Sequence, residues 1–321
     1  MIRFTLRRLL TAIPLAWAVV TVSFLLLEAA PGDVSGVLVP QGASPALREA
    51  ILTKWQLEAP MVTRYLTALG NLCSGDLGLS VVRERPVLDL IREALPATLA
   101  LTGCALAVMV LLGLGIGSLQ ALRRGSWLDR SATITSVVLH AVPSFWLAMV
   151  LVLCFALWFP VLPASQATDP MAAYLPAWRQ GLDRLAHLLL PALALGAANA
   201  ALIARHHRSA LLEVMDQDFI RTARSLGLGP WRVLTRHALR AAVLPTVTLL
   251  GVALPFLFSG SVVVERVFAW PGMGTLIFEG IEHQDTPVVL GCFLVYGLLV
   301  VVGGLLADLA AAALDPRIRL D

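Results

Sequence analysis

Long apolar runs alternate with shorter polar stretches along the whole chain. A helix that crosses a membrane needs about 20 consecutive, mainly apolar residues. Runs that reach or approach this length cover residues 9–28, 96–120, 132–159, 186–204, 244–264 and 287–313, and the fourth is the shortest. The pattern predicts an all-α polytopic membrane protein with six transmembrane helices, which places both chain ends on the same side.

The first apolar run follows the basic segment MIRFTLRRLL and extends to about Leu27. A cleaved signal peptide is the alternative, but its apolar region covers only about 7–15 residues and ends at a small-residue cleavage site. Here the run is longer, and Glu28 stands directly before Ala29 and Ala30. We therefore expect an uncleaved first span.

The distribution of basic residues between the loops predicts the orientation of the chain. If the N-terminus is inside, the inside segments are residues 1–8, 121–131, 205–243 and the tail from residue 314. These segments hold 15 of the 24 Lys and Arg residues, although the outside loops are nearly twice as long. Because basic residues concentrate in cytoplasmic loops, the bias favours an arrangement with both termini inside, N-in/C-in.

The long outside loop, residues 29–95, carries amphipathic patterns of its own. Ser44 and Pro45 suit the N-cap and the first position of a short helix, residues 62–69 repeat the pattern, and residues 86–95 lead into the second span. We expect short helices that lie on the membrane surface or on the bundle.

Small residues recur at four-residue spacing inside two of the predicted spans. They are Gly113 and Gly117 in the second span and Gly303, Ala307 and Ala311 in the last. Such residues let helix backbones approach closely in a membrane, so we expect helix packing at both places.

Composition agrees with a membrane protein, since 58% of the residues are hydrophobic, only 14% are charged, and the mean hydropathy is +0.81. Soluble domains carry about 25% charged residues. The formal net charge of +3 is too small to suggest a nucleic-acid partner. Cys73, Cys104, Cys154 and Cys292 share no CxxC spacing, so we expect packed thiols and neither a metal site nor a disulfide framework.

A basic, amphipathic stretch at residues 218–245 lies between the fourth and fifth runs. Asp218 can cap a short helix, Gly227 and Gly229 allow a sharp turn, and Pro230 suits the start of a second helix. Arginines then recur every four residues and so share one face: Arg232, Arg236 and Arg240.

Two interpretations of this helix pair stand side by side. Its arginines can rest on anionic lipid headgroups, or the pair can project toward a cytosolic partner. The corner favours the second interpretation, because a headgroup anchor needs no fixed angle between its helices.

Isolated polar residues inside the predicted spans are few. Asp308 lies near the inner end of the last span, where packing or capping is favoured over a functional carboxylate. His140 precedes a proline that can kink its helix, and a structural role is favoured over contact with a substrate. His206 and His207 point about 100° apart on a helix, which suits headgroup contact better than joint metal binding.

The basic stretch also resembles the coupling region of ABC importer permeases. That family motif begins Glu-Ala-Ala, has a glycine four residues later and ends at Leu-Pro; here Arg221-Thr222-Ala223, Gly227 and Leu244-Pro245 stand at these places. The missing acidic residue and the longer gap are similar to the dipeptide/oligopeptide/nickel branch. Eight further blocks resemble that branch in order: PGD at 31–33, GDLGLS at 75–80, RPVLDLI at 85–91, LPATLAL at 95–101, RRGSWLDR at 123–130, VPSFWLA at 142–148, VVVERVFAWPGMGTL at 262–276 and ALDPRIRL at 313–320.

This resemblance implies a type I ABC importer permease fold. It implies an N-terminal span with an extracytoplasmic helical loop at residues 1–94, a permease domain at 95–313 that contains the cytoplasmic segment 205–243, and a cytoplasmic tail at 314–321. The chain would form half of the translocation pathway in a bacterial or archaeal cytoplasmic (inner) membrane. Its cargo would be peptides or a related small solute, with nickel or a metal chelate as further candidates.

The resemblance also implies partners and sites. The partners are a second homologous permease, two cytosolic ABC ATPases, an extracytoplasmic solute-binding protein and membrane lipid. The implied ATPase-coupling residues are Asp218, Phe219, Arg221, Thr222, Ala223, Arg224, Leu226, Gly227, Gly229 and Pro230. Glu265, Phe268, Trp270, Pro271 and Gly272 form a turn that is either an aromatic anchor at headgroup depth or part of an outer gate or binding-protein dock.

ATP hydrolysis is not expected in this chain. A P-loop needs a glycine-rich turn followed by Lys and Ser or Thr, because the lysine reaches the phosphates. The only lysine, Lys54, lies in the sequence LTKW of the outside loop. We expect a non-catalytic subunit without a cofactor of its own, with ATP and Mg²⁺ on the partner ATPases.

Two alternatives from other classes have less support in the sequence. A membrane-embedded enzyme needs a nucleophile with a base, or metal ligands, at membrane depth, and the sequence contains no HExxH, no GxSxG and no paired span carboxylates. An ion-coupled secondary transporter usually carries charged relays in its spans, for which Asp308 alone is thin support.

Overall fold

The computed structural model describes residues 2–28, 44–55, 59–80 and 82–314. These residues form helices joined by turns, with a single antiparallel bridge between Leu79 and Pro86 and no β-strand among them. The all-α prediction is therefore confirmed. The PGD motif at 31–33 and most of the tail, residues 315–321, lie outside the described residues.

Two very long helices, α5 (Val87–Leu122) and α8 (Ala177–Met215), pack along each other through the centre of the bundle. Gly113 and Gly117 make this approach possible, because a Cβ on Gly117 would lie 2.6 Å from the backbone oxygen of Ala204. The predicted small-residue packing is confirmed. With 36 and 39 residues the helices are about 54 and 58 Å long, far beyond the about 30 Å of a hydrocarbon core.

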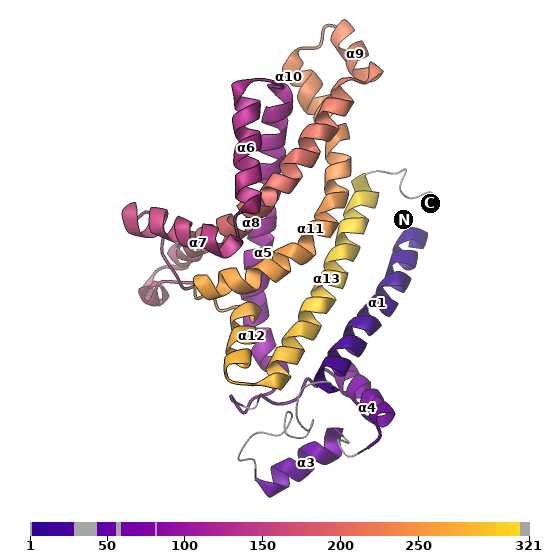
Figure 1. The fold of residues 1–321 in the computed structure, drawn as a ribbon, viewed down its shortest axis with the longest axis vertical. Coiled ribbons are helices and arrows are strands. Elements are labelled where there is room, and N and C mark those ends of the chain that lie inside the picture. Colours follow the sequence, from indigo (N-terminus) through magenta and orange to yellow (C-terminus); the bar gives the residue numbers. More distant parts are fainter. Residues whose placement is uncertain (1, 29–43, 56–58, 81, 315–321) are drawn as a thin grey trace.

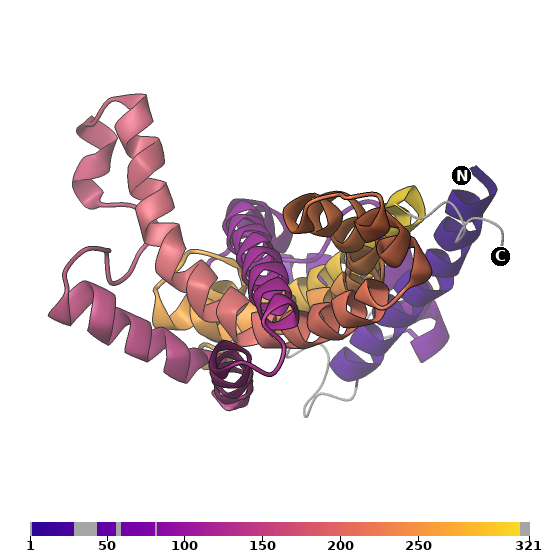
Figure 2. The ribbon, with the colours of Figure 1, turned by 90° about the horizontal axis from the view of Figure 1, so that it is seen from above.

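The segment predicted as one span at residues 132–159 is a bent pair of helices, and the kink that Pro143 allows is present. Helix α6 (Trp127–Ala141) ends before Pro143, and α7 (Ser144–Val152) continues into the π-helical turn η1 (Leu153–Trp158) at an angle of 107° to α6. Val142 is extended (φ −79°, ψ 128°), as expected for a residue that precedes proline. Figures 1 and 2 show that α7 and the following segment, with the 3₁₀ turn η2 (Pro170–Tyr174), project sideways from the bundle.

The last third of the chain forms three helices beside α8. Helix α10 (Pro230–Val233), the π-helical turn η3 (Leu234–Ala238) and α11 (Leu239–Val267) run on continuously. A short helix, α12 (Met273–Glu282), leads into α13 (Thr286–Leu314), which lies between α11 and α1 (Ile2–Glu28).

Small residues bring α13 close to both of its neighbours. Gly303 faces Leu254 of α11, and a Cβ on Gly251 would lie 2.9 Å from the Cβ of Ala307. Gly297 faces Val19 of α1 in the same way. The packing predicted for Gly303 and Ala307 is therefore confirmed.

The number of membrane crossings stays a prediction. Among the described residues three helices are long and apolar enough to cross alone: α5, α8 and residues 286–310 of α13. Counting each of two bent pairs as one crossing raises the number to five, and the apolar part of α1, Leu10–Leu25, is shorter than a full span. The expected count of six and the N-in/C-in orientation are not decided by this result.

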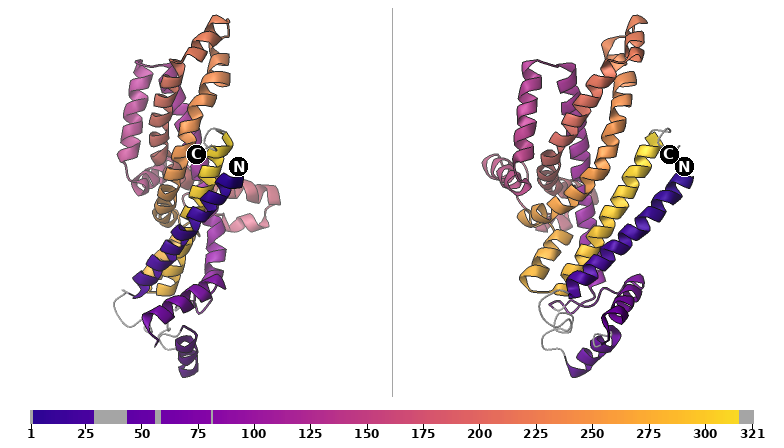
Figure 3. Two further views of the ribbon diagram at one scale, coloured as in Figure 1. Left: turned by 90° about the vertical axis from the view of Figure 1, so that its right-hand side faces the viewer. Right: turned by 45° about the vertical axis from the view of Figure 1, so that its right-hand side comes forward.

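Two short helices predicted in the outer loop are present: α3 (Pro45–Trp55) and α4 (Met61–Cys73). Helix α4 rests on α1, where the Tyr65 hydroxyl lies 2.7 Å from the Thr21 hydroxyl and the Tyr65 ring meets Phe24 edge-on. The third expected helix, residues 86–95, is instead the first part of α5. Figure 3 shows α3 and α4 at the end of the molecule opposite α9 (Asp218–Ser225) and α10.

Candidate functional site

The elbow, residues 216–230, joins α8 to α10 at one extremity of the molecule (Figure 1). Helix α9 occupies its outer part, and the chain then reverses at Gly227, whose φ of +75° lies in the left-handed region. Residues with a Cβ adopt this conformation at a cost, so glycine suits the position. The predicted corner between two helices is confirmed, with α10 beginning at Pro230.

The inner face of α9 is bound to the bundle by apolar contacts. Ile220 is fully buried and Ala223 is 5% exposed, both in a cluster with Leu211 of α8 and Val233 of α10. Burial of a large aliphatic side chain stabilises by about 1.5–3 kcal/mol. The elbow is therefore packed firmly against α8 and α10.

The outer face of the elbow is open. Phe219 and Leu226 are 42% and 75% exposed, and Trp231, the residue directly after the elbow, is 75% exposed. Of the residues predicted for ATPase coupling, only Ala223 is buried, while the other members of that set are exposed. Large apolar side chains at the tip of a projecting element are typical of a protein-binding surface.

Asp218 does not cap α9, contrary to expectation. The N-cap position belongs to Gln217, which makes no side-chain cap hydrogen bond. The Asp218 carboxylate instead accepts a hydrogen bond from Arg221 at 3.1 Å, one turn further along α9. Because both side chains are largely exposed, this pair contributes little stability.

Polar contacts lock α8 to its neighbours below the elbow. The buried His207 ring lies between two hydroxyls, with Nε2 3.1 Å from Ser118 Oγ on α5 and Nδ1 3.4 Å from Thr246 Oγ1 on α11. Headgroup contact was therefore the wrong prediction for His207, although His206 is exposed. The apolar residues Ile203 and Leu211, four positions either side, mark the inward face of this helix.

An ion pair fixes α6 to α8 at the same level. Arg208 donates to both carboxylate oxygens of Asp129, at 2.9 and 2.8 Å, and the Gly125 N–H donates to the same carboxylate at 2.9 Å. Asp129 is only 5% exposed. Ser126 caps α6 by accepting from the Asp129 N–H, so the RRGSWLDR block builds a rigid corner.

At the opposite end of α11, the outer turn (residues 268–275) folds over Glu265. The Glu265 carboxylate is fully buried and accepts hydrogen bonds from the Thr98 hydroxyl at 2.9 Å and from the N–H groups of Gly274 and Thr275 at 2.7 and 3.3 Å. The Thr98 oxygen accepts in turn from the Met273 N–H at 2.8 Å. The first three N–H groups of α12 thus all have acceptors, and a negative charge faces the N-terminal end of the helix.

The aromatic side chains of the outer turn are enclosed by protein, so they do not form the exposed aromatic anchor that was one of the two expectations. Phe268 and Trp270 are 1% and 4% exposed, and the Trp270 indole N–H donates to the Ala97 carbonyl of α5 at 2.9 Å. The backbone reverses at Ala269, whose φ is +48°, and this reversal turns both rings inward. At Gly272 a Cβ would lie 2.3 Å from Glu265 Oε2, so no larger residue fits.

Sequence comparison decides what kind of protein carries these elements. The family model described as "Binding-protein-dependent transport system inner membrane component" matches residues 113–320, and a model for the N-terminal part of such membrane components matches residues 1–102. This chain belongs to that permease family. The resemblance inferred from the sequence is confirmed, and the alternative of an ion-coupled secondary transporter gains no support from these matches.

Relatives of this permease match along its full length. It is 37% identical to the oligopeptide transport system permease protein AppB of Bacillus subtilis, covering 99% of this chain and 100% of that protein. It is 33% identical to the dipeptide transport system permease protein DppB of Escherichia coli, covering 99% of each. Inward-facing structures of the MetNI methionine ABC transporter share the fold, with 19% identity, a TM-score of 0.57 and coverage of 70% of this chain and 96% of that one.

Within this permease the predicted site residues fall into two structural groups. The elbow residues form a continuous exposed tip, as a docking element requires. Of the residues predicted for the outer gate or dock, Pro271 is exposed, and the other four are enclosed by their own chain: Glu265, Phe268, Trp270 and Gly272. The enclosed four shape the turn, so direct docking through their side chains does not fit the structure.

The remaining candidate residues stand outside these two groups. His140 lies 3.4 Å from the Ala198 carbonyl of α8 at the exposed end of α6, and Asp308 is partly buried in α13. All four cysteines are free. No cluster of three His, Cys, Asp or Glu residues within the described ranges is arranged to hold a metal ion.

Proposed function

We propose that this permease forms half of the translocation pathway of an ATP-driven importer for peptides. The elbow carries the proposal: an apolar, exposed tip on a corner fixed to two helices that run deep into the bundle. The names of the relatives, which are oligopeptide and dipeptide transport permeases, support peptides as the cargo.

The proposed complex contains a second homologous permease, two cytosolic ABC ATPases and an extracytoplasmic solute-binding protein, in a cytoplasmic (inner) membrane. ATP and Mg²⁺ belong to the ATPases, and the permease itself is non-catalytic. Residues 1–94 form the N-terminal unit, and residues 95–313 form the permease domain that contains the elbow. Nucleic acid has no part in this function.

Force applied to the elbow reaches the bundle through specific contacts. A push on α9 would be passed to α8 and α10, because Ile220 and Ala223 share one buried apolar cluster with residues of both helices. Helix α8 carries α6 through the ion pair of Asp129 with Arg208, and it carries α5 and α11 through the His207 contacts. ATP can shift the permease between two conformations only if the ATPases bind them with different affinity.

Uptake by the reconstituted importer tests this function. Proteoliposomes that contain both permeases and both ATPases, loaded with ATP and supplied with the binding protein outside, should accumulate radiolabelled dialanine. Vanadate or omission of the ATPases should abolish uptake, and collapse of the proton gradient should not. Uptake that requires a proton gradient and proceeds without the ATPases would exclude this function.

The matched pair Trp231 and Trp127 tests the role of the elbow within that assay. Both tryptophans are well exposed, at 75% and 78%, but only Trp231 belongs to α10, while Trp127 begins α6. Trp231→Ala should reduce ATPase co-purification and uptake together, whereas Trp127→Ala should leave both close to wild type. Equal behaviour of the two variants would refute the coupling role.

A further inference from the structure

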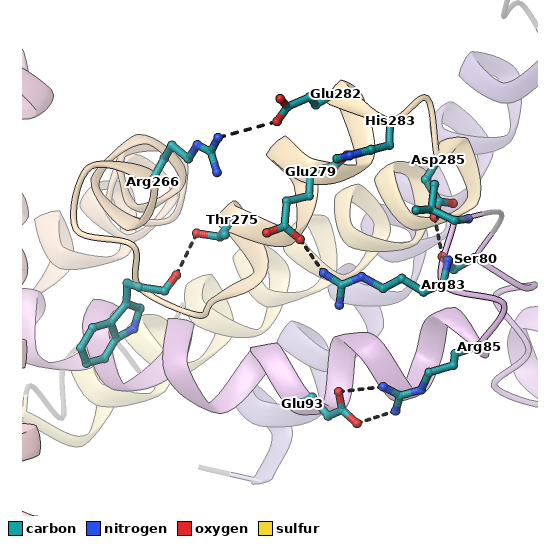
Figure 4. Close-up of polar contacts among 12 residues, drawn as sticks. Ser80, Arg83, Arg85, Glu93, Arg266, Thr275, Glu279, Glu282, His283 and Asp285 are labelled. Atoms are coloured by element: carbon teal, nitrogen blue, oxygen red, sulfur yellow. Dashed lines mark hydrogen bonds and ion pairs between the residues drawn. The ribbon is translucent and has the colours of Figure 1, made fainter. Parts of the chain in front are cut away.

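A cavity of about 440 Å³, the outer hollow, lies beside the outer turn. Its walls come from the first turns of α5, from Arg266 near the end of α11, from the outer turn itself and from α12. Figure 4 shows Arg266 on the α11 side and Glu93 on the α5 side. The volume falls within the about 300–1,000 Å³ of sites that bind small molecules.

Opposite charges surround this cavity in equal number. Two guanidinium groups, Arg83 and Arg266, and two carboxylates, Glu93 and Glu279, line it. Arg83 pairs with Glu279, and Glu93 is held from outside by Arg85 (Figure 4). The formal charge of the lining is therefore zero, which suits neither a simple anion nor a simple cation.

These charged groups keep the capacity for a further partner. The guanidinium of Arg266 lies 3.6 Å from Glu282, which is too long for a hydrogen bond, and both side chains are about half exposed or more. Arg83, Glu279 and Glu93 are between 36% and 61% exposed. Exposed ion pairs stabilise a fold by only about 0–1 kcal/mol, so stability alone gives little reason for four charges around one cavity.

We propose that the outer hollow binds a short zwitterionic peptide. Its carboxylate would be bound by the planar donor set of Arg266, and its ammonium group by Glu93 across the cavity, since Glu279 is already paired with Arg83. Leu90, Ala94 and Pro271 supply apolar wall between the charges, which accommodates peptide side chains without selecting one. The inference rests on the proposed function, because it names a first binding place on the permease for the same cargo.

The position of the cavity connects it to the end of α11. Gly272 and Thr275 line the hollow, and both also lie against the Glu265 carboxylate. A peptide in the hollow would therefore touch the turn that ends α11. The same helix, bent by 52° between Gly251 and Ala253, leads to the elbow at its other end.

Equilibrium binding tests the outer hollow directly. The intact importer complex in lipid nanodiscs, without its binding protein, is titrated with radiolabelled dialanine and competed with unlabelled dialanine or with N-acetyl-dialanine amide, which carries neither terminal charge. Saturable binding is expected, with the blocked peptide competing at least about tenfold less well, since charged hydrogen bonds are lost. Arg266→Gln and Glu93→Gln should each weaken binding by about tenfold or more.

Arg92→Gln is the matched control, because Arg92 pairs with Asp89 at 3.4 Å on the same end of α5 but does not line the cavity. It should bind dialanine like the wild type. Absence of saturable binding, equal competition by the blocked peptide, or unchanged affinity in both lining variants would overturn the inference. A lower affinity for the binding protein alone, with peptide binding unchanged, would also overturn it and would make the hollow a protein contact. ATP-driven uptake by wild-type proteoliposomes in the absence of dialanine binding would reject the hollow and leave the proposed importer intact.

Discussion

Substitution of Glu265 should break hydrogen bonds to the first turn of α12, and the free energy of unfolding lost with them follows from the structure. Glu265→Ala removes the only carboxylate that accepts from the Gly274 and Thr275 N–H groups in the described hydrogen-bond network. Each buried donor left without an acceptor costs about 1–3 kcal/mol, so the expected loss is about 2–6 kcal/mol. The Thr98 hydroxyl loses its acceptor as well, but it can rotate toward another.

The effect should be concentrated in α12 and the outer turn. Hydrogen exchange of the first α12 amides should accelerate in the purified complex, because these groups lose their acceptors. The melting temperature should fall by about 2 °C for each kcal/mol, the lower part of the range for large domains. Glu265→Gln should lie between wild type and Glu265→Ala, because one amide oxygen remains while its NH₂ group faces backbone donors.

Glu282→Ala provides the control for this experiment. Its carboxylate is 63% exposed and meets Arg266 only at 3.6 Å, so its removal should change stability by less than about 1 kcal/mol. If Glu265→Ala melts and exchanges like the wild type, the carboxylate does not hold the N-terminus of α12 and the outer turn is stabilised in another way.

Three further predictions concern the bundle and the elbow. Gly117→Ala should destabilise the complex by about 1–3 kcal/mol, because its Cβ meets the α8 backbone, whereas Gly103→Ala has nothing within 4 Å and should be tolerated in the same melting assay. Gly227→Ala should destabilise the elbow by about 1–2 kcal/mol, because φ is +75° there, and should lower uptake. Gly229→Ala, at φ −60°, should change neither stability nor uptake. Equal uptake by the two variants would contradict backbone strain at position 227. Asp129→Asn should destabilise the complex and lower its melting temperature. Breaking a fully buried ion pair costs about 3–5 kcal/mol, and the loss here should be somewhat smaller because the Arg208 side chain is 29% exposed. An unchanged melting temperature would show that the pair does not fix α6 to α8.

Apolar periodicity was sufficient to locate most of the helices of this permease. Length and hydropathy measure how much of a segment is apolar. By this measure α5, α8 and α13 are each long and apolar enough to cross a membrane. The same measure could not detect the 107° bend at Val142 and Pro143, because the residues on both sides stay apolar while the backbone changes direction.

The elbow was predictable because its signals are local. Gly227 and Pro230 each act on the backbone at their own position, so the corner follows from the sequence without knowledge of distant contacts. The cap expected from Asp218 failed because Asp218 is itself the first residue of α9 and Gln217 holds the N-cap position, and helix boundaries are the least certain part of such predictions.

The outer turn was misjudged because its partners are distant in sequence. Glu265 depends on Thr98, 167 positions away, and Trp270 depends on Ala97. Aromatic and turn residues after an apolar run are equally typical of an interfacial anchor. Only the reversal at Ala269 and the close approach at Gly272 turn these side chains inward, and neither feature is visible in composition or spacing.

Photo-cross-linking at the elbow tests the proposed coupling most directly. A photoreactive amino acid replaces Leu226, which is 75% exposed at the tip, and in a parallel strain replaces Leu157, which is 64% exposed on the projecting η1 turn. In intact cells position 226 should form an adduct with a cytosolic ATPase subunit, and position 157 should not. Adducts from position 226 only with lipid or with an extracytoplasmic protein would contradict the role of the elbow.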